Sequence, residues 1–402
     1  MQMNHFTRFL CLFILGILIH PLCFAQIQWQ KSLGGTGYDE ATSTQQTNDG
    51  GYIVAGESLS NDGDVTGNHG WLDYWIVKLA ATGAIQWQKS LGGTGYDEAN
   101  SIQQTNDGGY IVAGRSESNG GDVTGNHGTS DSWIVKLDAT GSIQWQKSLG
   151  GINGDVAKSI QQTNDGGYIV AGESDSNDGN VTGNHGNGDS WIVKLAATGS
   201  IQWQKTLGGT EEDYAYSIQQ TNDGGYIVAG ASYSNDGDVT GNHGDYDSWI
   251  VKLDVAGAIQ WQKSLGGTNP DVAHSIQQTN DGGYIVAGYS ESNDGDVTGN
   301  HGNGDYWIVK LGAATAIEAP SISRLSISPN PTLDKLEVEW ENLNPNKLSH
   351  IYLINALGQC VFSQKAENNY LQLDLSEMPS GVYFLRMEQA GKTSVVKKIC
   401  KL

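Results

Sequence analysis

The sequence predicts an all-β protein: a five-bladed β-propeller that is closed by its N-terminal strand and followed by a small Ig-like β-sandwich. One observation behind this prediction is an internal repeat of 58 residues that occurs five times without an insertion. Another is that each repeat contains four strand-like segments and no segment with a helical period. In addition, the array begins with a spare strand and ends one strand short.

The N-terminus predicts a secretory signal peptide over residues 1–25. Arg8 precedes an apolar run from Phe9 to Ile19, and Cys23-Phe24-Ala25 supplies small residues for cleavage before Gln26. The run is short for a bilayer span, so a retained anchor is the less favoured alternative. A lipoprotein site at Cys23 is weaker still, because the residues before it are not small.

One repeat shows the expected elements. The segments Ser101–Thr105, Tyr110–Gly114, Trp133–Leu137 and Ile143–Leu149 each read as a strand, and the last one alternates apolar and polar residues. Asn106-Asp107-Gly108-Gly109 is a tight-turn signal between the first two. The same tryptophans recur in every repeat: Trp29, Trp87, Trp145, Trp203 and Trp261, and Trp75, Trp133, Trp191, Trp249 and Trp307.

The ends of the array predict ring closure. Ile27–Leu33 is a fourth strand without a repeat of its own, and the fifth repeat stops after its third strand, Tyr306–Leu311. An open solenoid would carry capping units instead. We therefore assign residues 26–311 to a closed propeller, with a β-solenoid, or closure only after two chains associate, as alternatives. We expect the mature form to be monomeric.

The acidity of the chain belongs to the repeats. Between Gln26 and Pro320 there are 12 Lys and Arg against 36 Asp and Glu, whereas Ser321–Leu402 holds 9 and 8. Nucleic acids and anionic lipids require clustered cations, so neither is expected as a partner. Cations and neutral glycans remain compatible with this charge.

Function is expected at one pole of the ring, where the loops after the second and fourth strands of each blade emerge. The loops after the second strand span 61–70, 119–128, 177–186, 235–244 and 293–302. The loops after the fourth strand hold our candidate ligand-binding residues: Asp39, Asp97, Asp155, Asp213, Asp271, Tyr38, Tyr96 and Tyr214.

Metal binding is a weaker interpretation of the same loops, and no cofactor is expected unless calcium binds. The calcium candidates are Asp62, Asp64, Asp236, Asp238, Asp294 and Asp296. Gly120 and Asn180 interrupt this pattern in two repeats, and no downstream Glu completes it. Zinc is disfavoured because each of these loops has one histidine, such as His69, and five-fold symmetry does not suit a tetrahedral site. The favoured interpretation is structural: His, Asp and Trp in each blade form a buried hydrogen-bond chain, and Asn-Asp-Gly turns hold the loops.

A binding module is favoured over an enzyme. Catalysis needs unlike groups in one asymmetric place, whereas the repeats offer the same residues five times. The asymmetry is confined to positions such as Glu211, Glu212 and Tyr214 in the fourth repeat and Asn269 and Pro270 in the fifth. Exposed tyrosines in or beside the loops, which include Tyr233 and Tyr246, suit a glycan or protein ligand. A polysaccharide-active hydrolase at this pole is the alternative.

The C-terminal segment, 321–402, follows a linker at 312–320 and has a different composition. Its motif residues are Pro329, Asn330, Pro331, Gly358, Gly381, Tyr383, Lys397 and Lys398. In this order the motifs resemble the C-terminal sorting domain of Bacteroidota type IX secretion substrates. The resemblance implies that the type IX machinery is a partner and that the protein is secreted or attached to the outer-membrane surface. An adhesive Ig-like domain without a sorting role is the alternative. Cys360 and Cys400 either pair or remain free.

Overall fold

The computed structural model describes residues 27–313, 324–341, 349–356, 359–365, 370–389 and 392–402. The predicted signal peptide and most of the predicted linker lie outside these ranges. Every regular element in the described part of the chain is a β-strand, which confirms the all-β prediction. These residues include no helix long and apolar enough to cross a membrane.

Five consecutive sheets correspond to the five repeats, and the first four have four strands each in chain order. Blade 1 contains β1 (Asp39–Gln46), β2 (Tyr52–Ser58), β3 (Asp73–Leu79) and β4 (Ile85–Leu91). Blade 2 contains β5 (Asp97–Gln104), β6 (Tyr110–Ser116), β7 (Asp131–Leu137) and β8 (Ile143–Leu149). Blade 3 contains β9 (Asp155–Gln162), β10 (Tyr168–Ser174), β11 (Asp189–Leu195) and β12 (Ile201–Leu207). Blade 4 contains β13 (Asp213–Gln220), β14 (Tyr226–Ser232), β15 (Asp247–Leu253) and β16 (Ile259–Leu265). Blade 5 contains β17 (Asp271–Gln278), β18 (Tyr284–Ser290) and β19 (Asp305–Leu311).

Each blade is held at one end by a lysine, which is buried in the first four blades. The Lys136 ammonium, in β7, lies 2.9 Å from Asp107 in the tight turn between β5 and β6, and it also donates to the carbonyl of Leu137. Because the amine is almost fully buried, it needs both partners to offset the loss of water. The same pair occurs in the other blades as Lys78–Asp49, Lys194–Asp165, Lys252–Asp223 and Lys310–Asp281.

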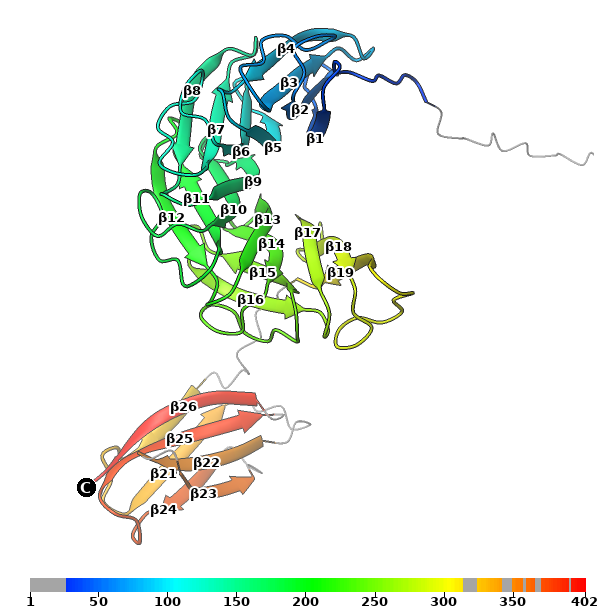
Figure 1. Ribbon diagram of the computed structural model, residues 1–402. Coiled ribbons are helices and arrows are strands. Elements are labelled where there is room, and N and C mark those ends of the chain that lie inside the picture. The colour runs from blue at the N-terminus through cyan, green and yellow to red at the C-terminus, as the bar shows by residue number, and fades with distance from the viewer. Residues whose placement is uncertain (1–26, 314–323, 342–348, 357–358, 366–369, 390–391) are drawn as a thin grey trace, which may run out of the picture. The chain divides into compact units, whose positions relative to one another are not determined.

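The apolar core lies between the blades. At the junction of blades 1 and 2, side chains of β2, β3 and β4 pack against β5, β6 and β7, and the same set recurs at the next two junctions. A fully buried Ile or Leu contributes ~1.5–3 kcal/mol relative to exposure. Figure 1 shows these four blades side by side, with the first strand of each on the inner edge. A single blade cannot bury both of its faces, so each blade depends on its neighbours.

On the side of blade 1 that faces away from blade 2, the sheet contacts the predicted closing segment instead of another blade. The ring of Trp29 packs edge-on against that of Tyr52, with centroids 5.6 Å apart, as Trp87 does against Tyr110. The Nε1 of Trp29 also donates to the Ala81 carbonyl. However, the described residues of the segment Ile27–Leu33 form no strand, and the sheet of β17–β19 has three strands. The blade architecture is confirmed, whereas the pairing that would close the ring is not formed in this structure.

Both halves of a further junction are nevertheless present. Trp29, Leu33, Tyr52 and Trp75 are among the residues lining a cavity of about 570 Å³ on blade 1. The equivalent surface of blade 2 accepts Tyr74, which is fully buried and donates to the Trp133 carbonyl. Blades 2 to 4 have serine at this position, but blade 5 has Tyr306, which is 95% exposed. The fifth blade thus carries the side chain that fits the open surface of the first.

Deleting residues 27–35 is expected to expose this surface further and to leave β19 without the strand assigned to it. Unpaired strand edges recruit other chains, so dimers or aggregates should form. Light scattering coupled to size-exclusion chromatography measures this, with a chain that begins at Gln26 as the control. A monomeric deletion variant with an unchanged melting temperature would contradict closure by the N-terminal strand.

The C-terminal unit is a two-sheet sandwich. One sheet contains β20 (Arg324–Ser328), β21 (Lys335–Glu341) and β24 (Tyr370–Asp374). The other contains β23 (Cys360–Lys365), β22 (Ser349–Asn355), β25 (Gly381–Gln389) and β26 (Lys392–Lys401). The core between them includes buried Leu336, Ile351, Leu353, Leu385 and Met387.

The predicted sorting motif is anchored to the last strand. The side-chain amide of Asn330 donates to the Lys398 carbonyl at 2.8 Å and accepts from the Cys400 amide at 2.9 Å. The Tyr383 hydroxyl donates to the Pro379 carbonyl. Lys397 and Lys398 are exposed on the surface, Gly358 lies outside the described residues, and Cys360 and Cys400 are both free thiols.

Candidate functional site

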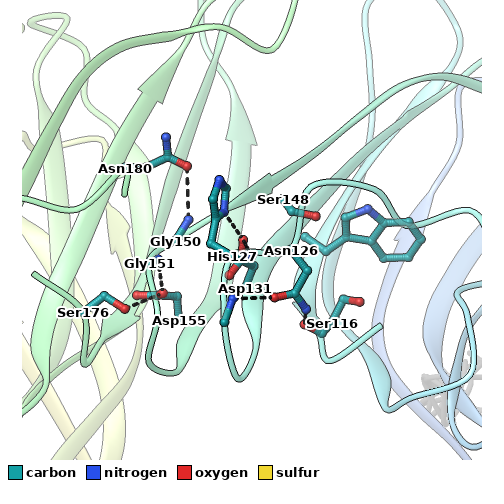
Figure 2. Close-up of polar contacts among 12 residues, drawn as sticks. Ser116, Asn126, His127, Asp131, Ser148, Gly150, Gly151, Asp155, Ser176 and Asn180 are labelled. Carbon is teal, nitrogen blue, oxygen red and sulfur yellow. Dashed lines mark hydrogen bonds and ion pairs between the residues drawn. The ribbon is translucent and has the colours of Figure 1, made fainter. Parts of the chain in front are cut away.

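The recurring aspartates that follow the fourth-strand loops are part of the blade framework. Asp155 is fully buried, and its Oδ2 accepts the Gly151 amide at 2.8 Å and the Ser176 hydroxyl at 2.9 Å (Figure 2). Its Oδ1 accepts a hydrogen bond from the Ser174 hydroxyl. Asp97, Asp213 and Asp271 are equally buried, and Asp39 makes the same contacts in blade 1, where it is partly exposed. The sequence placed these five carboxylates among the ligand-binding candidates. The structure uses them to fold the loops.

The histidines form the expected pairs with aspartates, but the tryptophans do not join them. His127 Nδ1 lies 2.6 Å from Asp131 Oδ2, with Asp131 fully buried and about two fifths of the histidine side chain exposed (Figure 2). The indole of Trp133 donates instead to Gln146 in the next strand. The expected three-residue chain is therefore two separate pairs. The other His–Asp pairs are His69–Asp73, His185–Asp189, His243–Asp247 and His301–Asp305.

Two buried carboxylates meet at each formed junction. A Cβ at Gly150 would lie 2.4 Å from Asp155 Oδ2 and 2.9 Å from Asp131 Oδ1, so only glycine fits between them. Asp131 Oδ1 has no hydrogen-bond partner. Burial raises the pKa of Asp155 to about 6, against hydrogen bonds from Ser174, Gly151 and Ser176 that lower it, and Asp131 adds to the rise.

The calcium candidates are engaged by their own chain. Asp236 accepts the Thr210 amide at 2.8 Å and the Thr210 hydroxyl at 3.0 Å, and Asp62 and Asp294 accept the equivalent threonines. Asp64 Oδ2 accepts the Gly34 amide, and the backbone amides of Asp238 and Asp296 donate to the Gly208 and Gly266 carbonyls. Among the described residues, no three His, Cys, Asp or Glu side chains are placed to hold one metal ion.

Most strongly variable positions of the repeats lie at one end of the blades. They flank the buried Asp at the start of the first strand, or lie at the end of the second strand or just before the third. These three places meet at one end of each sheet. We call this end of the blades the variable pole. In blade 4 it holds Glu211, Glu212, Tyr214, Tyr216, Ala231, Tyr233, Asp245 and Tyr246. In blade 5 it holds Asn269, Pro270, Val272, His274, Tyr289, Glu291, Asn303 and Gly304.

Six of these side chains form a continuous aromatic track across blades 4 and 5. Its order is Tyr233, Tyr246, Tyr214, Tyr216, His274 and Tyr289. Successive ring centroids lie 5.1, 5.9, 5.9, 5.2 and 5.8 Å apart. These are ordinary contact distances for aromatic rings.

A carboxylate is fixed beside the track. The Tyr214 hydroxyl donates to Glu212 Oε2 at 2.8 Å, and the Tyr246 hydroxyl donates to the same oxygen. The bond from Tyr246, followed by that from Tyr214, lowers the pKa of Glu212. Glu212 therefore remains ionised and holds two rings of the track in place.

A second aromatic pair lies at the variable pole of blades 1 and 2. Trp71 stacks on Tyr96 with centroids 5.5 Å apart and an interplanar angle of 19°, and more than half of Trp71 is exposed. Tyr38, in blade 1, is exposed and donates to Glu40. Of the five tyrosines proposed from sequence, Tyr214, Tyr233 and Tyr246 lie in the track, Tyr96 in this pair, and Tyr38 in neither.

Sequence reasoning missed Tyr216, His274, Tyr289 and Trp71. Each lies in a column of the five aligned repeats that varies from blade to blade, and the column shared by Tyr216 and His274 holds Thr, Asn, Lys, Tyr and His. Column-by-column alignment of the repeats would therefore have identified them. It would not have shown that residues of different blades meet.

Residues 326–401 match the family described as the secretion system C-terminal sorting domain. The C-terminal domain therefore carries a type IX secretion sorting signal, which directs the protein to the cell surface or the extracellular space. Together with the blades, this defines an exported, extracellular β-propeller-like protein.

The chain also has more distant similarities. The regulatory protein FlaEY of Caulobacter vibrioides is 27% identical over 180 residues, which cover 41% of this chain and 18% of FlaEY. The extracellular domain of the putative one component system BT4673 from B. thetaiotaomicron is 13% identical, with a TM-score of 0.35 over 90% of this chain and 44% of that one. PorZ, a surface component of the type IX secretion system of Porphyromonas gingivalis, is 11% identical, with a TM-score of 0.28 over 92% and 53%. Superpositions this weak carry no functional information.

The buried carboxylates predict a stability maximum at mildly acidic pH. Burial raises the pKa of Asp73, Asp155 and Asp189 to about 6, above the unfolded value, so the folded state binds protons more tightly and is stabilised as the pH falls from about 7 to 5. Asp107 behaves oppositely: burial alone would raise its pKa, but hydrogen bonds from Thr105, Lys136 and Gly109 lower it to about 2, and its contribution is lost below about pH 4.

Thermal unfolding as a function of pH measures this. The melting temperature should be highest near pH 5, and Asp73→Asn should flatten the slope between about pH 5 and 7. A melting temperature that rises steadily from pH 5 to 8 would contradict the assignment.

Chelation is expected to leave the melting temperature unchanged within about 1 °C, because a cation that does not bind the folded state cannot stabilise it. The Thr210 contacts already occupy Asp236. Scanning calorimetry with and without chelator measures this, and a fall of several degrees would show that the loops bind calcium.

Proposed function

We propose that the repeat domain is a monomeric extracellular binding module, that its ligand is a glycan, and that the ligand lies on the aromatic track. The track is the observation that carries the proposal. Six rings drawn from two blades form one surface where the repeats otherwise have different residues. A conserved framework with variable positions on one face is the usual arrangement of repeat proteins that bind ligands.

The chemistry of the track suits a sugar chain. Tyrosine rings offer large, rigid apolar faces to the C–H faces of pyranose rings, and they cost little side-chain entropy on binding. Tyr233 is 44% exposed and His274 is also exposed, so the two halves of the track are accessible to a ligand. An extended row of rings fits several consecutive sugar units better than a single small molecule.

Binding without turnover is favoured over hydrolysis. A glycosidase requires a carboxylic acid whose pKa is raised, so that it can protonate the leaving oxygen. The carboxylate within the track, Glu212, instead has its pKa lowered by two tyrosine hydroxyls. Glu211 is exposed and accepts a hydrogen bond from Asn187. Hydrolysis that disappears on changing Glu211 or Glu212, but not the equivalent residues of other blades, would establish the enzyme instead.

Substitution of the track separates these possibilities. Tyr216→Ala removes a central ring and should weaken glycan binding on an array roughly fivefold or more, because each aromatic contact contributes about 1 kcal/mol or more. Tyr38→Ala is the matched control, since this tyrosine is exposed at the same pole but outside the track. Binding of a protein, with no glycan bound, would replace the glycan by a protein partner.

A further inference from the structure

The surroundings of the aromatic track are strongly acidic. Besides Glu212, it has Asp245 beside Tyr246, whose amide donates to the Asp245 carboxylate at 2.9 Å, and Glu291 on the same blade as Tyr289. Glu173 and Asp175, at the pole of blade 3, lie close enough for their charges and that of Glu212 to act on one another. The track therefore lies in a region of negative potential.

The tyrosine hydroxyls respond to this field. Burial, followed by the negative charges of Glu173 and Glu212 among others, raises the pKa of Tyr216 to about 12. Burial and then Glu291 and Asp245 raise the pKa of Tyr289. The carboxylates thus act on both halves of the track.

The basic side chains at neighbouring positions neutralise only part of this charge. Arg115, in blade 2, is committed to Glu98 through two hydrogen bonds of 2.9 and 2.7 Å. Lys158, in blade 3, is 3.6 Å from Glu173. Among the described side chains of the track and its rim, Glu212, Asp175, Asp245 and Glu291 form no salt bridge with a lysine or arginine.

We infer that the ligand of the aromatic track is a positively charged glycan, one whose sugar units carry free ammonium groups. This inference rests on the proposed glycan-binding function and adds the charge of the ligand to it. An amino sugar presents a C–H face for stacking and an ammonium for the carboxylates. Cations are also attracted to the faces of aromatic rings, so rings and carboxylates act on the same group. A glycan rich in uronate or sulfate would be repelled by the same surface.

The test compares three oligosaccharides of equal length: a glucosamine oligomer, its N-acetylated form and a galacturonate oligomer. Titration calorimetry at mildly acidic pH and low salt measures their affinities for the full chain. We expect the glucosamine oligomer to bind roughly tenfold or more tightly than the acetylated one, and the galacturonate oligomer to bind least. The preference should decline with added salt, because exposed charges are screened.

Glu212→Gln isolates the charge, since the amide keeps the shape and an acceptor for the tyrosine hydroxyls. It should weaken glucosamine binding roughly threefold to tenfold and leave the acetylated oligomer unaffected. Glu40→Gln is the matched control, because Glu40 also accepts a tyrosine hydroxyl at the variable pole, but in blade 1. Asp175→Asn is a second test of charge, because the Asp175 carboxylate lies at the rim of the track and does not contact the rings directly.

The outcomes separate the two proposals. Equal binding of the charged and acetylated oligomers, lost in Tyr216→Ala, would overturn the charge preference and retain a glycan-binding module. Tightest binding of the galacturonate oligomer would also overturn it. A failure of all three oligomers, together with the rest of a glycan array, would overturn both.

Discussion

The packing of one blade against the next is the interaction on which this protein depends. The repeats contain no cysteine, so no disulfide can link the blades. Their described residues contain no helix, so no helical layer covers the faces of the sheets. Each interior blade buries one face with the Trp–Tyr contact of its preceding neighbour, seen as Trp87 on Tyr110, and the other with Ile, Ala and Leu side chains. A substitution that weakens one junction therefore destabilises both of the blades that meet there.

The close approach of the blades has an electrostatic cost. Asp131 and Asp155 belong to different blades, and a single glycine, Gly150, separates their carboxylates. The cost is offset because Asp155 accepts hydrogen bonds from the loop of its own blade. The donors are Gly151, Ser174 and Ser176. These buried groups give the variable pole a rigid base, on which residues such as Tyr214 and Tyr216 can differ without disturbing the junctions.

The framework could be predicted from sequence because it depends on local patterns that recur five times. The strand order, the tight turns and the sandwich with its sorting motif were all predicted, and the first strands begin slightly earlier than expected, at Asp97 instead of Ser101. The aromatic track could not be predicted, since Tyr216 and His274 are 58 residues apart and meet only when two blades are in place. Tyr216 also lies at a strand irregularity between Ala215 and Ser217, which changes the direction of its side chain relative to a simple alternation. Sequence reveals the recurrence of the aspartates but not their burial, so it could not show that Asp155 is bonded within its own loop.

The near identity of the junctions has a consequence for the evolution of the chain. Trp145 meets Tyr168 with the same geometry as Trp203 meets Tyr226, so the contact surfaces of these blades are interchangeable. Unequal recombination between repeats would add or remove a whole blade while leaving every remaining contact chemically the same. Copy number could then change before the residues at the pole did. The tyrosines at positions 74 and 306 are the exceptions, and they mark the blades that begin and end the array.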